Sequence, residues 1–328
     1  MNKQQLHELI KNKQPNICQI VAIKNNEVVY KDTWNNYDDS DNIHIASVTK
    51  SITSLLVGIA IDKGYIKSVD QKVLDFFEEY KIKRGEKTIQ TVEIKHLLTM
   101  TAPYKCKGEP WTKVCSSDDW VTSTLDLLGG KNGITNEFRY FTLGLQILNG
   151  IIFKASNMKT IQFANKYLFE SLDIKPRIGY NVKTKEEHIK FITKKTAQTN
   201  RWLSDSNEIP SAGFGLCLSA IDLAKIGLLC LNKGIYNNKR IVSEKWIKQI
   251  TTPYINCDSR YNHMQYGYLW WIIDEKKHIY AAIGDSGNVI YINETDNLVI
   301  TITSTFKPRI LDRIDFIEEY IIPYVKMR

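Results

Sequence analysis

A serine and a lysine stand at the head of an apolar helix predicted near the start of the chain. Ser47 and Lys50 are three residues apart, and the sequence continues as a mainly apolar run from Ser51 to Ile61. Side chains at this spacing share one face of a helix, so a hydroxyl and an amine come within reach of each other before any tertiary contact forms. Gly64 follows the run and is the residue type that commonly ends a helix.

These two side chains are candidates for a nucleophile and its base. A serine alcohol is a weak nucleophile at neutral pH and needs a neighbour to take its proton. A lysine pKa near ~10.4 must fall to roughly 7–8 for this task, and burial lowers it by disfavouring the charged form. The alternative is that Ser47 only caps the helix and Lys50 is solvated. A cation in the first turn opposes the helix dipole, so Lys50 disfavours this alternative.

The same Ser-x-x-Lys spacing occurs twice more, at Ser156–Lys159 and at Ser304–Lys307. Ser156 lies in a polar stretch that is typical of a helix end. Ser304 follows a strand-like run and precedes Pro308. Only Ser47 begins a long apolar helix, so context separates it from the other two serines.

The composition limits the kinds of partner. The chain has 328 residues, of which 43% are hydrophobic and 24% charged, which is typical of one large globular domain or two modest ones. The net charge is +8, but lysines and arginines are spread along the chain rather than clustered. A nucleic-acid surface is therefore not expected. A small-molecule or peptide-like substrate is the expected partner, and the oligomeric state is left open.

The chain beginning and the cysteines predict a cytoplasmic protein. The segment from Met1 to Ile10 is too polar for a signal peptide, and no run approaches the ~20 apolar residues of a membrane span. The six cysteines form no Cys-x-x-Cys pair, so reduced thiols are expected.

Strand patterns occur near both ends of the chain, and helical patterns fill the middle. Two strands, Ile17–Ile23 and Glu27–Tyr30, flank a hairpin turn at Asn25-Asn26. Later strands are predicted at Tyr266–Ile273, His278–Ile283, Val289–Ile292 and Leu298–Ser304. Helices are predicted at Ser51–Ile61, Val92–Leu98, Gly144–Phe153, Ile161–Leu172 and along Ile310, Ile314, Ile317 and Ile321. Two polar stretches, Trp111 to Trp120 and Asn181 to Glu208, are expected to be loops over a cleft.

This pattern predicts an α/β (α+β) fold in a single domain, residues 1–328. One antiparallel sheet would be assembled from the two chain ends and flanked by helices. The predicted sheet lobe comprises about residues 1–45 and 232–328, and the mostly helical lobe about 46–231.

Several segments, in the same order, resemble the serine β-lactamase and penicillin-binding (DD-peptidase) family, nearest its class C-like and esterase-like branch. They are Ile45 to Phe77, Val92 to Thr101, Ser211 to Leu216 with Asp222 to Lys225, and Tyr266 to Trp271. The resemblance covers almost the whole chain. It implies that the fold is β-lactamase-like and that Ser47 is the nucleophile.

The second motif of this family is Tyr-x-Asn, and by order it falls at Tyr140-Phe141-Thr142. Strict Tyr-x-Asn sequences at Tyr236, Tyr254 and Tyr291 come too late in the chain. The resemblance implies that Tyr140 exchanges a proton with Ser47 and the leaving group. Thr142 replaces the family's asparagine with a hydroxyl. The alternative for Tyr140 is a packed aromatic side chain at a helix start.

The third motif is Lys-Thr-Gly or His-x-Gly, and the matching positions are Asp285-Ser286-Gly287. Gly287 would permit close backbone approach, and the N–H groups of Asn288 and Ser47 would form an oxyanion hole. Asp285 is an anion where relatives carry a cation or a neutral group. It should repel a substrate carboxylate, unless it points away from the site or pairs with a lysine.

The resemblance therefore implies a serine hydrolase that cleaves an ester or amide through an acyl-enzyme on Ser47, with neither metal nor cofactor. A metal-dependent hydrolase is disfavoured because the chain has no His-Glu-x-x-His sequence. A trypsin-like nucleophile at Ser286 is disfavoured because no histidine has the required setting. The departures at Thr142 and Asp285 leave a second possibility, a non-catalytic penicillin-binding or sensor-like module on the same scaffold.

Overall fold

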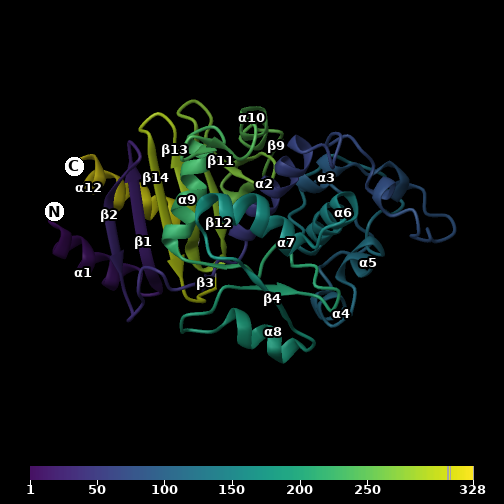
Figure 1. Ribbon diagram of the computed structural model, residues 1–328, viewed down its shortest axis with the longest axis horizontal. Coiled ribbons are helices and arrows are strands. Elements are labelled where there is room, and N and C mark those ends of the chain that lie inside the picture. Colours follow the sequence, from purple (N-terminus) through teal and green to yellow (C-terminus); the bar gives the residue numbers. More distant parts are fainter. Residues whose placement is uncertain (309, 311, 328) are drawn as a thin grey trace.

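An eight-stranded antiparallel sheet forms the centre of the computed structural model, which describes residues 1–308, 310 and 312–327 (Figure 1). The strand order across the sheet is β2-β1-β14-β13-β12-β11-β10-β9. The strands are β1 (Ile17–Lys24), β2 (Glu27–Thr33), β9 (Ile255–Asn256), β10 (Gln265–Tyr266), β11 (Trp271–Asp274), β12 (Ile279–Gly284), β13 (Asn288–Asn293) and β14 (Leu298–Ser304). The predicted sheet from both chain ends is confirmed.

The pairing of β1 with β14 joins the two ends of the chain. Val21 lies opposite Thr301, and the register continues to Lys24 opposite Leu298. Every residue of β13 and β14 is buried, because helices cover both faces of the sheet. Asn25 and Asn26 both have positive φ, which is the backbone of a type I′ hairpin turn and agrees with the prediction.

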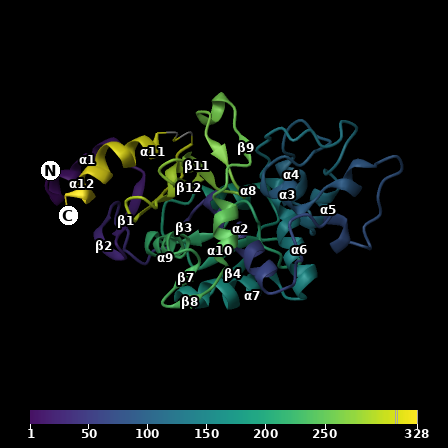
Figure 2. The ribbon, with the colours of Figure 1, turned by 90° about the horizontal axis from the view of Figure 1, so that it is seen from above.

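Terminal helices cover one face of the sheet. They are α1 (Lys3–Lys13), α11 (Arg313–Phe316), the π-helical turn η8 (Ile317–Ile321) and α12 (Ile322–Lys326). Leu6 and Ile10 of α1 share a core with Ile317 and Ile321, and Figures 1 and 2 both show the chain ends close together. The C-terminal helix agrees with the predicted spacing but begins after Ile310. Helix α1 was not predicted, and a capping box at Asn2 starts it.

The other face of the sheet carries α2 (Val48–Asp62) and α9 (Ala220–Leu231), with the helical part of the chain beyond them. The remaining helices are α3 (Ile94–Leu98), α4 (Trp111–Cys115), α5 (Trp120–Leu125), α6 (Gln146–Ser156), α7 (Thr160–Ala164), α8 (Lys185–Ile192) and α10 (Glu244–Ile250). Short strand pairs are β3 (Ile43–His44) with β6 (Cys217–Leu218), β4 (Ile178–Asn181) with β5 (Arg201–Ser204), and β7 (Ile235–Tyr236) with β8 (Lys239–Arg240).

Single turns complete the chain: η1 (Val73–Phe76), η2 (Thr88–Thr91), η3 (Leu143–Leu145), η4 (Asn165–Phe169), η5 (Glu170–Leu172), η6 (Ser259–Tyr261) and η7 (Asp285–Gly287). Helix α9 packs on the sheet, although its residues fall in the range assigned from sequence to the helical lobe. We propose a single domain with two lobes that meet along α2 and α9.

Helix α2 is the central helix and is buried from Val48 to Ala60. Its hydroxyl side chains bond to both lobes: Ser51 Oγ donates to Leu269 O at 2.6 Å, and Thr53 Oγ1 donates to Ala212 O at 2.8 Å. These bonds satisfy polar groups that would otherwise destabilise the core. They also fix the position of the residue that precedes the helix, Ser47.

Three predicted segments differ from the structure. Trp111 to Trp120 and Asn181 to Glu208 were expected to be loops, but they contain α4, α8 and β5. Helix α8 is mostly polar and exposed, and a capping box between Thr184 and Glu187 supports it, so its apolar pattern is weak. Tyr266 to Ile273 was expected to be one strand. A turn closed by Gly267 N–H and Trp270 O instead divides it into the paired strands β10 and β11.

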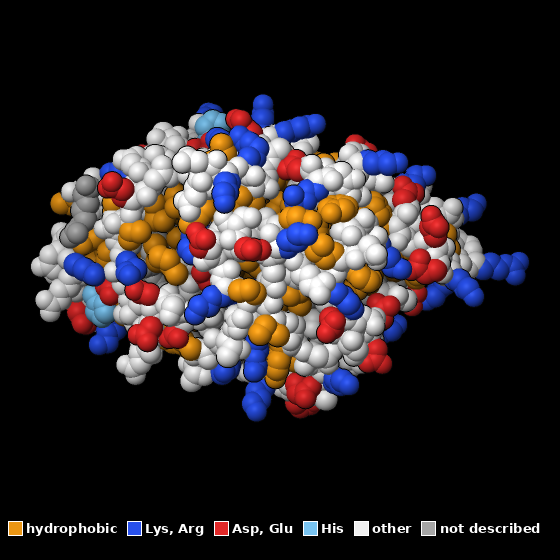
Figure 3. Space-filling view, viewed as in Figure 1, with side chains coloured by type: hydrophobic (Ala, Val, Ile, Leu, Met, Phe, Trp, Pro, Cys, Tyr) orange, Lys and Arg blue, Asp and Glu red, His pale blue; other side chains and the backbone are white. Residues whose placement is uncertain are grey.

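All six cysteines carry free thiols. Among the described residues, no helix is both long and apolar enough to cross a lipid bilayer. On the face shown in Figure 3, basic and acidic side chains are interspersed.

Candidate active site

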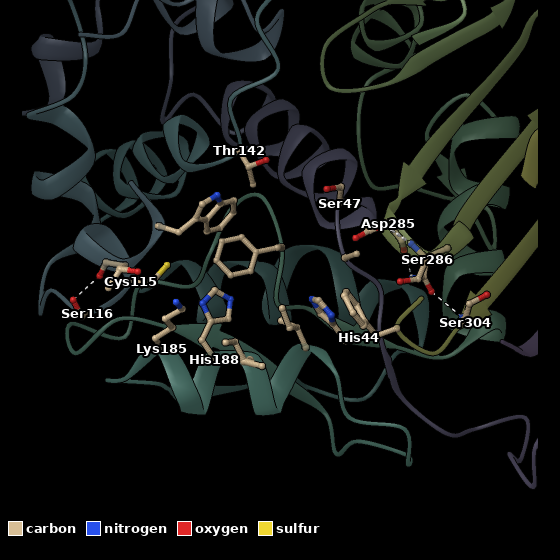
Figure 4. A pocket seen from close by; sticks show the side chains of 18 residues that line it. His44, Ser47, Cys115, Ser116, Thr142, Lys185, His188, Asp285, Ser286 and Ser304 are labelled. Atoms are coloured by element: carbon tan, nitrogen blue, oxygen red, sulfur yellow. Dashed lines mark hydrogen bonds between the residues drawn. The ribbon is translucent and has the colours of Figure 1, made fainter. Parts of the chain in front are cut away.

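Ser47 lies at the N-cap position of α2, three residues after the end of β3, and faces a cavity (Figure 4). Its side chain makes no capping hydrogen bond to the helix. Ala46, the preceding residue, has φ of 48°, a conformation that L side chains rarely adopt and that occurs often at functional sites. The serine hydroxyl therefore occupies a capping position without performing the capping role.

Lys50 is buried beneath this serine. Its side chain is 1% exposed, and Nζ donates to Ser47 Oγ at 2.7 Å and to Gly213 O at 2.8 Å. Burial lowers the Lys50 pKa to about 7, and the negative charge of Glu109 opposes part of that effect. Within the described part of the chain, Lys50 forms no ion pair. The amine is thus poised to exist in both protonation states near neutral pH.

Tyr140 approaches the same pair from the loop before η3. The centre of its ring lies 4.9 Å from Lys50 Nζ. Burial raises the Tyr140 pKa above its ordinary value, and a hydrogen bond to the Ser47 side chain opposes this increase. Tyr140 also stacks on Trp271, with ring centres 5.9 Å apart. The phenol is therefore both a packed aromatic side chain and a protonated group beside the serine.

Glu109 holds the loop that follows Tyr140, and sequence reasoning did not identify it. Its carboxylate accepts the N–H of Thr142 at 3.0 Å and that of Leu143 at 2.8 Å. The methyl group of Thr142 packs close to Gly213, where a Cβ would lie 2.6 Å from it. No local pattern marks Glu109, because its partners lie 33 and 34 residues later in the chain.

The turn Asp285–Gly287 joins β12 to β13 beside the nucleophile. A Cβ on Gly284 would lie 2.5 Å from Ile45 O and 3.1 Å from Ser47 N, so its backbone touches the nucleophile segment. Gly287 has φ of 80° and faces the Arg313 guanidinium instead. The glycine that permits close approach to Ser47 is therefore Gly284, three residues before the expected position.

The side chains of the third motif hold this turn and the cavity rim. Asn288 Nδ2 donates to Asp285 O at 2.8 Å, and Asn288 Oδ1 accepts Ser304 N–H at 2.9 Å. Ser286 is buried, and its hydroxyl oxygen accepts Lys307 N–H at 3.0 Å. Asp285 is exposed, lines the cavity and forms no ion pair among the described residues. Asp285 therefore matches neither alternative considered from the sequence, because it does not pair with a lysine and does not point away from the cavity.

Two further residues fix the underside of the turn. Asn16 Nδ2 donates to Ser286 O at 2.9 Å, and the buried Arg313 guanidinium donates to the same carbonyl at 3.4 Å. Burial lowers the Arg313 pKa to about 10. The two ends of the chain therefore support the turn beside Ser47.

The cavity has a volume of about 360 Å³, and Ser47, Thr142, Asp285, Ser286 and Asn288 contribute to its lining. Figure 4 shows Ser47 and Thr142 on one side and His44 and His188 on the other. Neither Lys50 nor Tyr140 is among the described residues that line it. In the described ranges, no group of three or more His, Cys, Asp or Glu side chains is arranged to hold a metal ion.

Comparison with known proteins gives a consistent result. The family model described as Beta-lactamase matches residues 18–316. The 6-aminohexanoate-dimer hydrolase of Paenarthrobacter ureafaciens is 20% identical over 307 residues, which cover 87% of this chain and 71% of that protein.

Two solved structures have the same fold. The octameric penicillin-binding protein homologue from Pyrococcus abyssi superposes with a TM-score of 0.70 at 20% identity, covering 99% of this chain and 78% of that one. The penicillin binding protein from Bacillus halodurans superposes with a TM-score of 0.69 at 16% identity, covering 96% and 99%.

Proposed function

The chain belongs to the β-lactamase family, and we propose that it is a serine hydrolase that cleaves an ester or amide through an acyl-enzyme on Ser47. One observation carries the proposal. Lys50 Nζ lies 2.7 Å from Ser47 Oγ, is buried without an ion-pair partner among the described residues, and has a pKa lowered to about 7. A neutral amine in this position can take the serine proton as Oγ attacks the substrate carbonyl.

Tyr140 supplies the complementary acid. Burial lowers the Lys50 pKa and raises the Tyr140 pKa, so the two groups favour opposite roles at neutral pH. The phenol donates its proton to the leaving group when the tetrahedral intermediate collapses. The phenolate regains a proton from the Lys50 ammonium, directly or through a water molecule, because Ser47 Oγ is esterified at this stage; water then hydrolyses the acyl-enzyme by the reverse transfers.

The backbone N–H groups of Ser47 and Asp285 would hold the oxyanion. The approach of Gly284 to Ser47 N supports this choice, because the next N–H in the chain belongs to Asp285. Asn288, the donor expected from sequence, pairs with Gly284 in the β12–β13 ladder. Its side chain would then stabilise the turn rather than the oxyanion.

The substrate is a small molecule or a peptide-like amide. A relative named as a 6-aminohexanoate-dimer hydrolase makes a linear amide one reasonable test compound. The alternative function is a penicillin-binding or sensor-like module that is acylated but not turned over. Thr142 favours this alternative. Its short hydroxyl cannot donate and accept hydrogen bonds over the same distance as the asparagine side chain that the family has at this position.

Labelling with a fluorophosphonate probe tests the proposal. We expect one adduct, on the Ser47 peptide, and none in Ser47→Ala. Wild type should also hydrolyse p-nitrophenyl acetate in multiple turnovers. A fluorescent penicillin that labels Ser47 permanently, with no turnover of any ester, would favour the sensor-like module. An adduct on Ser286 alone would reject Ser47 as nucleophile.

A further inference from the structure

We infer that the cavity beside Ser47 binds the acyl group of the substrate, and that this group is an uncharged, apolar ring or chain carrying a hydrogen-bond acceptor that reaches His44. The inference rests on the proposed function and defines the substrate class more narrowly. It follows from the side of Ser47 on which the cavity lies, from its walls and from the tautomer of His44.

The cavity lies on the acyl side of the nucleophile. The leaving group must reach Tyr140, which protonates it. Ser47, Asp285 and Asn288 line the cavity. Among the described residues that line it, neither Tyr140 nor Lys50 is found. A substrate that presents its leaving group to Tyr140 therefore directs its acyl group into the cavity. The volume of about 360 Å³ suits a ring or a short chain.

Aromatic and aliphatic side chains form most of the walls. His188 stacks on Phe214 with ring centres 5.2 Å apart, and Trp111 meets Phe214 edge to face at 5.1 Å. Ile189 and Ile192 of α8 complete this wall. An apolar acyl group buried here gains roughly 25 cal/mol for each Å² removed from water.

His44 provides a fixed donor on the opposite wall from Ser47. Its Nε2 accepts the N–H of Gly215 at 3.0 Å, so this nitrogen carries no proton. Burial lowers the His44 pKa to about 3, and a neutral imidazole must then hold its single proton on Nδ1. Within the described chain, Nδ1 has no hydrogen-bond partner. Its N–H is available to an acceptor on a ligand.

The charges around the cavity disfavour a charged acyl group. Burial also lowers the pKa of His188, so both histidines are neutral near pH 7. Of the described lining residues, Asp285 and Lys185 carry formal charges, and both are exposed at the rim. A buried ion inside the cavity would lack a counter-charge, which is costly. A neutral acceptor such as an ether or carbonyl oxygen fits better.

A matched pair of esters tests this inference. p-Nitrophenyl tetrahydropyran-4-carboxylate and p-nitrophenyl cyclohexanecarboxylate share a leaving group and a shape but differ by one ether oxygen. The ratio of their kcat/KM values, oxygenated over carbocyclic, should fall about 2- to 10-fold in His44→Phe, as expected for one neutral hydrogen bond. His44→Gln keeps an acceptor and a donor and should retain most of the ratio. A ratio that is equal in wild type and His44→Phe would overturn the inference.

The ratio is independent of the fraction of active protein, because both esters are measured on the same preparation. His44→Leu replaces His44→Phe if the latter does not fold. Trp111→Ala adds an independent test of the wall, since Trp111 is already 36% exposed. It should lower kcat/KM for the cyclohexyl ester more than for p-nitrophenyl acetate, and an equal effect on both esters would contradict the assigned wall.

Binding to Ser47→Ala separates failure of the inference from failure of the proposed function. Tetrahydropyran-4-carboxamide and cyclohexanecarboxamide are each titrated into Ser47→Ala, and binding is followed by the change in tryptophan fluorescence. The same titration of Ser47→Ala with an added Trp111→Phe substitution shows how much of the signal comes from the cavity wall. A preference for the oxygenated amide that disappears with His44→Phe supports the site even if no ester is hydrolysed. Equal affinities overturn it even if Ser47 is an active nucleophile.

Discussion

Replacing Lys50 with methionine should abolish activity and stabilise the fold. The Lys50 pKa falls from its ordinary value of 10.5 to about 7 on folding. The unfolded chain therefore holds this proton up to higher pH than the folded protein does, and stability rises as pH increases from about 7 to about 10.5. The difference in pKa corresponds to about 5 kcal/mol of cost near pH 7, at ~1.4 kcal/mol for each tenfold change.

The loss of the lysine's hydrogen bonds offsets part of this gain in stability. Methionine cannot donate to Gly213 O or Ser47 Oγ, and an unsatisfied buried acceptor costs about 1–3 kcal/mol. The net gain in the free energy of unfolding for Lys50→Met should be about 2–4 kcal/mol at pH 7. At ~2.1 cal/mol/K of unfolding entropy per residue, a chain of 328 residues shifts its Tm by about 1.5 °C per kcal/mol. The expected increase in Tm is therefore about 3–6 °C.

Thermal unfolding followed at pH 7, 8.5 and 10 measures this effect, and ester hydrolysis measures the loss of activity, at least ~10²-fold. The stabilisation should shrink as pH approaches 10. Lys67→Met, at an exposed lysine in the loop that follows the same helix, is the control and should change stability by less than ~0.5 kcal/mol at every pH. If Lys50→Met is less stable than wild type, with a difference that does not vary with pH, then Lys50 is charged in the fold and cannot be the base.

Four other outcomes follow from the site. Lys50→Arg should be almost as inactive as Lys50→Met in initial-rate assays, because a guanidinium does not lose its proton in proteins; near-normal rates would exclude proton transfer. Glu109→Gln should lower the Lys50 pKa further and move the acid limb of the kcat/KM profile to lower pH; an unmoved limb would make Glu109 purely structural. Asp285→Asn should raise the kcat/KM ratio of nitrocefin to p-nitrophenyl acetate about 5-fold, since an exposed charge at ~4 Å is worth about 1 kcal/mol in water, and high salt should remove the change. Gly284→Ala should reduce kcat/KM about 100-fold by displacing Ser47, whereas Gly108→Ala, whose Cβ meets no atom within 4 Å, should not.

The parts of the fold that local pattern decides were predicted from the sequence. Leu298–Ser304 forms the expected strand, and the apolar run from Ser51 forms the expected helix. Helix α8 escaped prediction because exposed polar residues dominate it and its start depends on a capping box. The strand expected from Tyr266 to Ile273 failed because a run of aromatic residues hides the turn that divides it.

The site was predicted where side chains lie close together in sequence, and less well where the fold brings them together. The spacing of Ser47 and Lys50 placed both groups on one helical face. Glu109 could not be found, because its contacts with the loop after Tyr140 exist only in the folded chain. Gly284 and Gly287 are indistinguishable by sequence alone, and only packing shows which of them touches the nucleophile segment.

The pairing of β1 with β14 also sets an order of events during synthesis. Thr303 lies 284 positions after its hydrogen-bond partner Gln19. At ~5–20 residues per second, a ribosome needs on the order of 15–60 seconds to make the intervening chain. Throughout that interval the apolar strand β1 has an unpaired edge, because its neighbour β14 has not yet been made. An unpaired strand edge can form hydrogen bonds with other chains and so cause aggregation. Mutations that slow the emergence or closure of β14 should therefore reduce the soluble yield in cells more than they reduce the stability of the finished protein.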